Sequence, residues 1–158
     1  MHSYDTLRNN LFARLFSYTP REGRKPIEDF CTETLAWCLL ESPTFRQRFL
    51  SLIDRKRDWG EVDIATQYSY RTADGEEDAK AESDAGRFDL LITTRETPSL
   101  AVVIESKVDS SFGFQQISRY KNSPALKKYQ DAMVITLTPS ATKPTDAKGA
   151  DGHIPWAQ

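Results

Sequence analysis

Residues 101–108 constrain the fold more than any other stretch, because this strongly apolar run carries one acid and one amine. Side chains alternate between the two faces of a strand, so Glu105 and Lys107 share a face with Val103. The apolar neighbours predict an interior strand, where a charged pair is costly unless it is solvated in a cleft, paired or bound to a metal. The segment therefore predicts a functional site on a buried strand.

A second predicted buried strand, residues 87–93, carries Asp89 among apolar neighbours. The short connection over residues 94–99 is compatible with a hairpin, and a suitable antiparallel register puts Asp89 beside Glu105. Adjacent carboxylates repel each other unless a proton or a cation neutralises them, and oxygen ligands of this kind suit Mg²⁺ or Mn²⁺. Lys107 would then orient, or help to deprotonate, a metal-bound water.

Asp89, followed sixteen positions later by Glu105-Ser106-Lys107, resembles the D…(D/E)-x-K signature of the PD-(D/E)XK nuclease superfamily. Phe88 stands where the name-giving motif has proline, which weakens only the match to the written pattern. The predicted order of elements also matches the superfamily core: a helix with a glutamate, a strand, the two strands of the signature, a helix and a further strand.

Two helical motifs extend the resemblance. Gln116 and Tyr120 resemble the Q-x-x-x-Y motif of the RecB-like branch and share one helical face, although Gln115 leaves open which glutamine faces the site. Residues 28–36 resemble the E-x-x-x-T-E-x-L-A helix found upstream in some branches. In the resembling family a helix glutamate such as Glu33 faces the metal site.

The resemblance implies a nuclease in which Mg²⁺ (or Mn²⁺) activates a water for attack on a phosphodiester bond. Asp89 and Glu105 are then expected to be metal ligands, with the main-chain carbonyl of Ser106 as a third. Lys107 is expected to position the nucleophile or to stabilise charge on the phosphorane. These residues form the core of the predicted site.

The helical residues are expected to act in support. The Gln116 amide would hold the attacking water or a phosphate oxygen, and the Tyr120 phenol would contact the scissile backbone; the alternative is a helix that simply packs on the sheet. Glu33 is expected to be an extra acidic metal ligand or water anchor, against the alternative of a surface glutamate. Glu28 is interpreted as a helix-start residue.

The hydrophobic periodicity predicts an α+β, mixed α/β fold. Helical spacing comes first and strand-like alternation follows, with an acidic run predicted to be a loop at residues 72–86. Together with the resemblance, this order predicts a restriction-endonuclease-like core: a central mixed β-sheet flanked by helices, after an N-terminal helical segment. The remaining predicted helices cover residues 5–18, 26–40, 42–53 and 114–120, and the remaining strands residues 61–71 and 131–137.

The length of 158 residues suits a single domain over residues 1–158. The last residues resemble the start of another element, so we expect the chain to be the N-terminal part of a longer protein. With no apolar run of about 20 residues and no signal-peptide pattern, the expected location is the cytoplasm. Cys31 and Cys38 are expected to be buried thiols, neither a disulfide nor a metal pair.

The first functional hypothesis is a metal-dependent endonuclease acting on DNA. A net charge of −2 argues against a dedicated nucleic-acid coat protein, but not against a nuclease. Two alternatives stay open: a non-catalytic nucleic-acid-binding or scaffold domain of the same fold, and an RNA-directed nuclease. By analogy, we expect an effector of bacterial anti-phage defence, joined to a sensor or NTPase domain, and leave homo-oligomerisation open.

Overall fold

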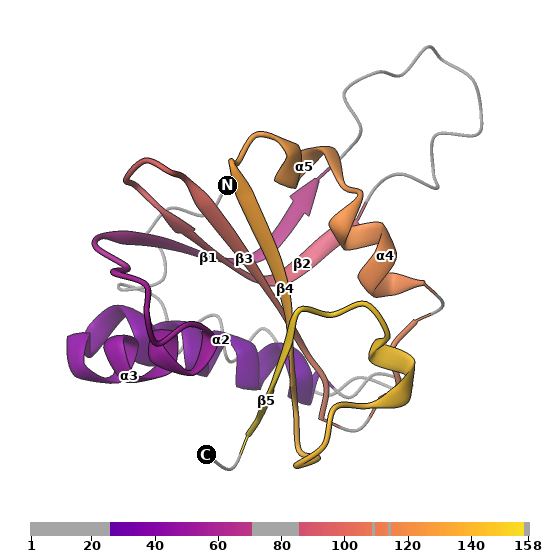
Figure 1. The fold of residues 1–158 in the computed structure, drawn as a ribbon. Coiled ribbons are helices and arrows are strands. Elements are labelled where there is room, and N and C mark those ends of the chain that lie inside the picture. Colours follow the sequence, from indigo (N-terminus) through magenta and orange to yellow (C-terminus); the bar gives the residue numbers. More distant parts are fainter. Residues whose placement is uncertain (1–25, 71–85, 109, 114, 157–158) are drawn as a thin grey trace.

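The computed structural model describes residues 26–70, 86–108, 110–113 and 115–156 (Figure 1). The predicted helix at residues 5–18 lies outside this part of the chain, as does the predicted acidic loop apart from its two ends. Two helices precede a five-stranded sheet, and the elements follow in the order α2 (Ile27–Glu41), α3 (Pro43–Ile53), β1 (Val62–Tyr70), β2 (Gly86–Thr94), β3 (Leu100–Ser106), α4 (Gln116–Lys121), α5 (Pro124–Lys127), β4 (Asp131–Thr138), the 3₁₀ helix η2 (Thr145–Ala147) and β5 (Gly152–Pro155).

The five strands form one mixed sheet in the order β1-β2-β3-β4-β5. β1, β2 and β3 pair antiparallel, whereas β3, β4 and β5 pair parallel. Parallel neighbours need a crossover connection, and α4 and α5 lie in the crossover from β3 to β4. β3 is the middle strand and all of its residues are buried, which confirms the predicted interior strand; it ends at Ser106, so Lys107 follows it.

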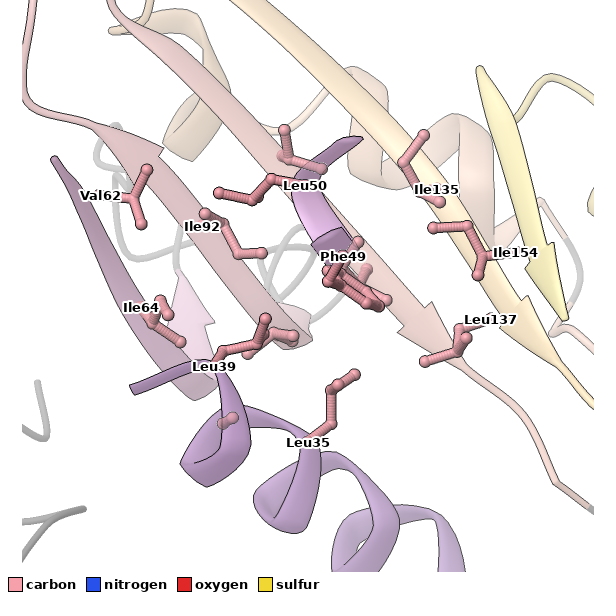
Figure 2. Close-up of a cluster of buried hydrophobic side chains, with 14 of the residues drawn as sticks. Leu35, Leu39, Phe49, Leu50, Val62, Ile64, Ile92, Ile135, Leu137 and Ile154 are labelled. Atoms are coloured by element: carbon pink, nitrogen blue, oxygen red, sulfur yellow. The ribbon is translucent and has the colours of Figure 1, made fainter. Parts of the chain in front are cut away.

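Helices cover both faces of this sheet (Figure 1). α2 and α3 pack on one face around a first core, whose members include Leu39, Phe49 and Ile92 (Figure 2). α4 and α5 contribute to a second core on the other face, in which Ile117 lies with Val103. The predicted fold, a central mixed sheet flanked by helices with a helical segment before it, is confirmed.

Capping chemistry accounts for the first turn of α3, whereas α2 has acidic residues in its first turn and no side-chain cap. The Ser42 hydroxyl accepts a hydrogen bond from the Phe45 amide at 3.2 Å, and Pro43 occupies the first helical position, as the sequence predicts. α2 begins at Ile27, one residue later than predicted. Its first turn carries Glu28 and Asp29, whose negative charge suits the positive end of the helix dipole.

β5 is a strand that the sequence did not predict. It pairs parallel with β4 at the edge of the sheet. Its short sequence includes a glycine and a proline, which strands disfavour, and Ile154 is its one buried residue. Tertiary pairing with β4 therefore overrides a weak local preference.

The two cysteines are free thiols in α2, as predicted, but both are only half-buried. In the described ranges, no helix is both long and apolar enough to cross a membrane.

Candidate active site

The pairing of β2 with β3 brings Asp89 and Glu105 to adjacent positions. The paired register runs to Leu90 opposite Ile104, so the next residues outward are Asp89 and Glu105. The Ser106 amide donates a hydrogen bond to Asp89 Oδ2 at 3.0 Å, which ties the two strands together at this point. The two predicted acids therefore share one end of a strand pair, as expected from a short hairpin between them.

Glu105 is buried, with only 1% of its surface exposed, and three side chains donate to its carboxylate. Lys107 Nζ lies 2.7 Å from Oε1, and Gln116 Nε2 lies 2.5 Å from the same oxygen. The Tyr120 hydroxyl lies 2.8 Å from Oε2. Burying a carboxylate is costly unless it is paired and hydrogen-bonded, and these three donors meet that requirement.

Asp89 has a strongly raised pKa, about 8 in place of its usual acidic value. Burial is the largest cause, and the nearby Glu105 charge is the second, while the Ser106 amide, Lys107 and Arg87 act in the opposite direction. Without a cation, Asp89 is therefore mainly protonated at neutral pH. A divalent cation would oppose both causes of the raised pKa, because it offsets the repulsion from Glu105 and favours the ionised form of the buried carboxyl.

Lys107 connects Glu105 to the start of α2. Its ammonium lies 3.7 Å from Glu28 Oε2 as well as against Glu105. Burial acts to lower the pKa of Lys107, but Glu105, Glu28 and Asp89 outweigh it and raise that pKa. Lys107 therefore stays protonated and acts as a hydrogen-bond donor and positive charge, not as a base.

Glu28 is part of this cluster, which sequence reasoning missed. Its Oε1 accepts hydrogen bonds from the Val108 amide at 3.1 Å and the Ser110 hydroxyl at 2.5 Å. Burial acts to raise the pKa of Glu28, but the Ser110 and Val108 hydrogen bonds and the Lys107 charge leave it lowered. Glu28 thus fastens the segment after β3 to α2. Its place as the first residue of the E-x-x-x-T-E motif was the available signal.

Gln116 and Tyr120 face Glu105 from the second core, whereas Gln115 is exposed just before α4. Gln116 Nε2 lies 2.9 Å from the Tyr120 hydroxyl, which lies 2.9 Å from the Arg87 carbonyl oxygen. Burial, followed by the Glu105 charge, raises the pKa of Tyr120, so the phenol keeps its proton. The glutamine that contacts Glu105 is therefore Gln116, the one spaced four residues from Tyr120, and its role in the site stays a prediction. Tyr120 also packs on the sheet, so the packing alternative describes part of its role.

Glu33 is fully buried in α2, so its interpretation as a surface glutamate is wrong. Ser106 is also buried, and its amide is the donor to Asp89. The roles of Glu33 as an acidic ligand and of the Ser106 carbonyl as a metal ligand stay predictions.

The donor set suits a hard divalent cation through two carboxylates. Within residues 26–70, 86–108, 110–113 and 115–156, no group of three histidine, cysteine or acidic side chains is placed to hold a metal. Asp89 and Glu105 are the adjacent pair, and the Glu105 charge contributes, after burial, to the raised pKa of Asp89, a repulsion that a cation would offset. A cation held here would need main-chain oxygen or water as its other ligands, which Mg²⁺ commonly accepts.

Comparison with known proteins gives a match to one family. The model of the PD-(D/E)XK nuclease superfamily matches residues 8–156. No curated protein and no solved structure matches the chain. The match spans almost the whole chain, including both strands of the acid pair and α4.

Proposed function

The chain belongs to the PD-(D/E)XK nuclease superfamily, whose membership suggests phosphodiester hydrolysis, and on this premise we propose that it is a Mg²⁺- or Mn²⁺-dependent endonuclease acting on DNA. The observation that carries the proposal is the meeting of Asp89 with Glu105 on adjacent strands, with Lys107 against Glu105. These residues are the D…E-x-K signature in space.

In this proposal the acid pair, Lys107 and Glu28 have different tasks. Asp89 and Glu105, with the Ser106 carbonyl, hold the cation, which supplies Lewis-acid activation of water and neutralises phosphate charge. Lys107 keeps its proton because of the surrounding acids, so it stabilises negative charge developing on the phosphoryl group. Glu28 supports this task by holding the segment that carries Lys107.

The residues of α4 orient Glu105. Gln116 and Tyr120 each donate to one oxygen of that carboxylate, so they fix its rotamer before substrate binds. Direct contact of Gln116 with a water or phosphate, and of Tyr120 with the scissile backbone, is the further role that we propose. Their arrangement supports assignment to the RecB-like branch, where a Q-x-x-x-Y motif follows the E-x-K strand.

A scaffold domain is the second candidate, and one observation favours it. Glu105 and Lys107 form a buried ion pair that is complete without a cation, as a purely structural pair would be.

The RNA-directed nuclease keeps the same chemistry and differs only in substrate. We also propose that the protein acts in the cytoplasm as an anti-phage effector, together with a sensor or NTPase domain.

One experiment separates these functions. The protein is incubated with plasmid, linear DNA and RNA in Mg²⁺, Mn²⁺ or EDTA, beside Glu105→Gln and the control Asp63→Asn. Asp63 is a half-buried β1 acid paired with Arg95, remote from the signature in sequence. Cation-dependent cleavage of DNA by the wild type and Asp63→Asn, but not by Glu105→Gln, supports the proposal. Cleavage of RNA alone favours the third hypothesis, and no cleavage of any substrate favours the scaffold.

A defence role needs its own test in cells. The full-length protein, wild type or Glu105→Gln, is expressed in a bacterial host that is then challenged with a panel of phages. Lower plaque counts with the wild type alone are expected. Equal plaque counts for both proteins across the panel count against the defence role and leave the nuclease proposal untouched.

A further inference from the structure

Gln67 in β1 has an unusual backbone conformation. Its φ of 51° lies in the left-handed region, which residues other than glycine seldom adopt. Thr66 pairs with Leu90 and Tyr68 pairs with Phe88, so Gln67 lies between these pairs, across from Asp89. A strained residue therefore neighbours one of the two acids of the candidate site.

Both strands change the face that they present at this point. Ile64 lies in the first core, whereas Tyr68 lies against the second core and stacks on Phe88 with ring centroids 6.1 Å apart. On β2, Leu90 belongs to the first core and Phe88 to the second, although side chains two apart on a regular strand share a face. Gln67 and Asp89 therefore lie at the point where the alternation of side chains between the two cores changes in both strands.

The carboxamide of Gln67 is left without a hydrogen-bond partner. Its Nε2 and Oε1 are both buried and bond to nothing within the described part of the chain. Buried amides are nearly always hydrogen-bonded, since an unmade bond is destabilising. Asp89, its neighbour across the strand pair, uses Oδ2 for the Ser106 amide. An unpaired donor and acceptor are thus held next to an acid of the site.

We propose that Gln67 is a positioning residue of the cation site: its Nε2 donates to the Asp89 carboxylate, and its Oε1 accepts from a water of the bound cation. This inference rests on the proposed function, because it needs a cation at Asp89 and Glu105. Cation binding favours the ionised form of Asp89, which then accepts from Nε2, and brings the water that donates to Oε1. Residues that hydrogen-bond to metal ligands typically change metal affinity by 10–100-fold when they are replaced.

The chain offers a matched control, because Gln115 also has a φ of 51° but is exposed. Gln67→Met removes the carboxamide at nearly constant volume, and Gln115→Met does the same on the surface. Gln67→Asn is the second variant: asparagine tolerates the left-handed region better, and its amide is one methylene shorter. Mn²⁺ affinity is measured by calorimetric titration without substrate, and stability by melting curves in EDTA.

We expect the metal-free Gln67 variants to melt at or above the wild-type temperature, since Gln67→Met no longer buries an unpaired amide and Gln67→Asn tolerates the left-handed backbone better. Their Mn²⁺ dissociation constants should rise about tenfold or more, while Gln115→Met changes neither quantity. Unchanged Mn²⁺ affinity, or failure of both Gln67 variants to fold, overturns the inference. If the wild type itself binds no Mn²⁺, or Glu105→Gln binds it equally well, the proposed function fails first. Wild-type binding that is lost in Glu105→Gln but kept in Gln67→Met refutes the role of Gln67 alone.

Discussion

The Lys107 ammonium lies 2.7 Å from Oε1 of Glu105, and only the lysine of this pair reaches solvent. Glu105 is fixed in the middle strand of the sheet, and Lys107 follows the end of that strand. Because Lys107 is also near Glu28, one positive charge lies between two carboxylates just beyond the end of β3. A catalytic site and a structural ion pair both require this contact, so variants must distinguish them.

The signature residues should be essential for cleavage. Asp89→Asn, Glu105→Gln and Lys107→Met should each lower cation-dependent cleavage by about three orders of magnitude, because each removes charge at the reacting centre. Since the three act as one unit, a double variant should lose little more than a single one. Initial cleavage rates of purified, folded variants provide the measurement. Wild-type rates in any one of them would remove that residue from the site.

Tyr120→Phe should cost stability more than activity. The change leaves the buried Glu105 Oε2 without a donor, and about 1–3 kcal/mol of unfolding free energy should be lost. Cleavage should fall less than in Gln116→Ala, because Tyr120→Phe removes one hydroxyl and keeps the ring, whereas Gln116→Ala removes the whole carboxamide. Urea unfolding and cleavage rates of Tyr120→Phe are compared with those of the control variant Tyr129→Phe. Tyr129 is a half-buried tyrosine of the same core. Equal stability losses in both variants would show that the Glu105 contact has no special weight.

Glu28→Gln should slow cleavage without abolishing it. The amide keeps an oxygen for the Val108 amide but removes the charge near Lys107, so a loss of roughly tenfold in kcat/KM is expected, in the range of outer-shell partners. Glu41→Gln, at the other end of α2, should have no effect. An unchanged kcat/KM in Glu28→Gln would show that Glu28 acts only as a helix-start residue.

The acid pair and the α4 motif were predictable because they follow from local rules. Alternation with a period of two, and a short connection, set which residues of β2 and β3 meet, and spacing by four puts Gln116 and Tyr120 on one face. Glu28 was missed because the helix dipole already explains an acid at a helix start, so no further role was needed. Only tertiary packing shows that its side chain reaches the chain beyond β3.

The unpredicted features depend on the backbone more than on side-chain pattern. β5 combines weak strand formers that only pairing with β4 holds extended. The left-handed φ of Gln67 leaves no mark in the sequence, because the residues around it continue a regular polar and apolar alternation. A change of face within a strand pair is invisible to a method that assumes constant alternation.

Asp89 should make the metal-free protein less stable as pH rises. Its pKa is about 8 in the folded protein, against about 3.9 in an unfolded chain, so between these values the folded state binds more protons. The contribution to stability is full below about pH 3.9 and is lost as pH rises through about 8. Asp89→Asn lacks this loss, so in EDTA it should melt above the wild type at pH 9, and the difference should shrink at pH 5.

Cation binding should restore the stability that the protein loses when Asp89 ionises. At a free Mn²⁺ concentration ten times the dissociation constant, linkage gives RT ln 11, or about 1.4 kcal/mol, which corresponds to a few degrees of melting temperature. The wild type should gain this stability while Asp89→Asn gains little, and Glu105→Gln should be destabilised even in EDTA because Lys107 loses its buried partner. Melting curves of the three proteins, in EDTA and across a Mn²⁺ titration at pH 8, test these expectations. A wild type that ignores Mn²⁺, together with a strongly destabilised Glu105→Gln, would identify the ion pair as structural and the domain as a scaffold.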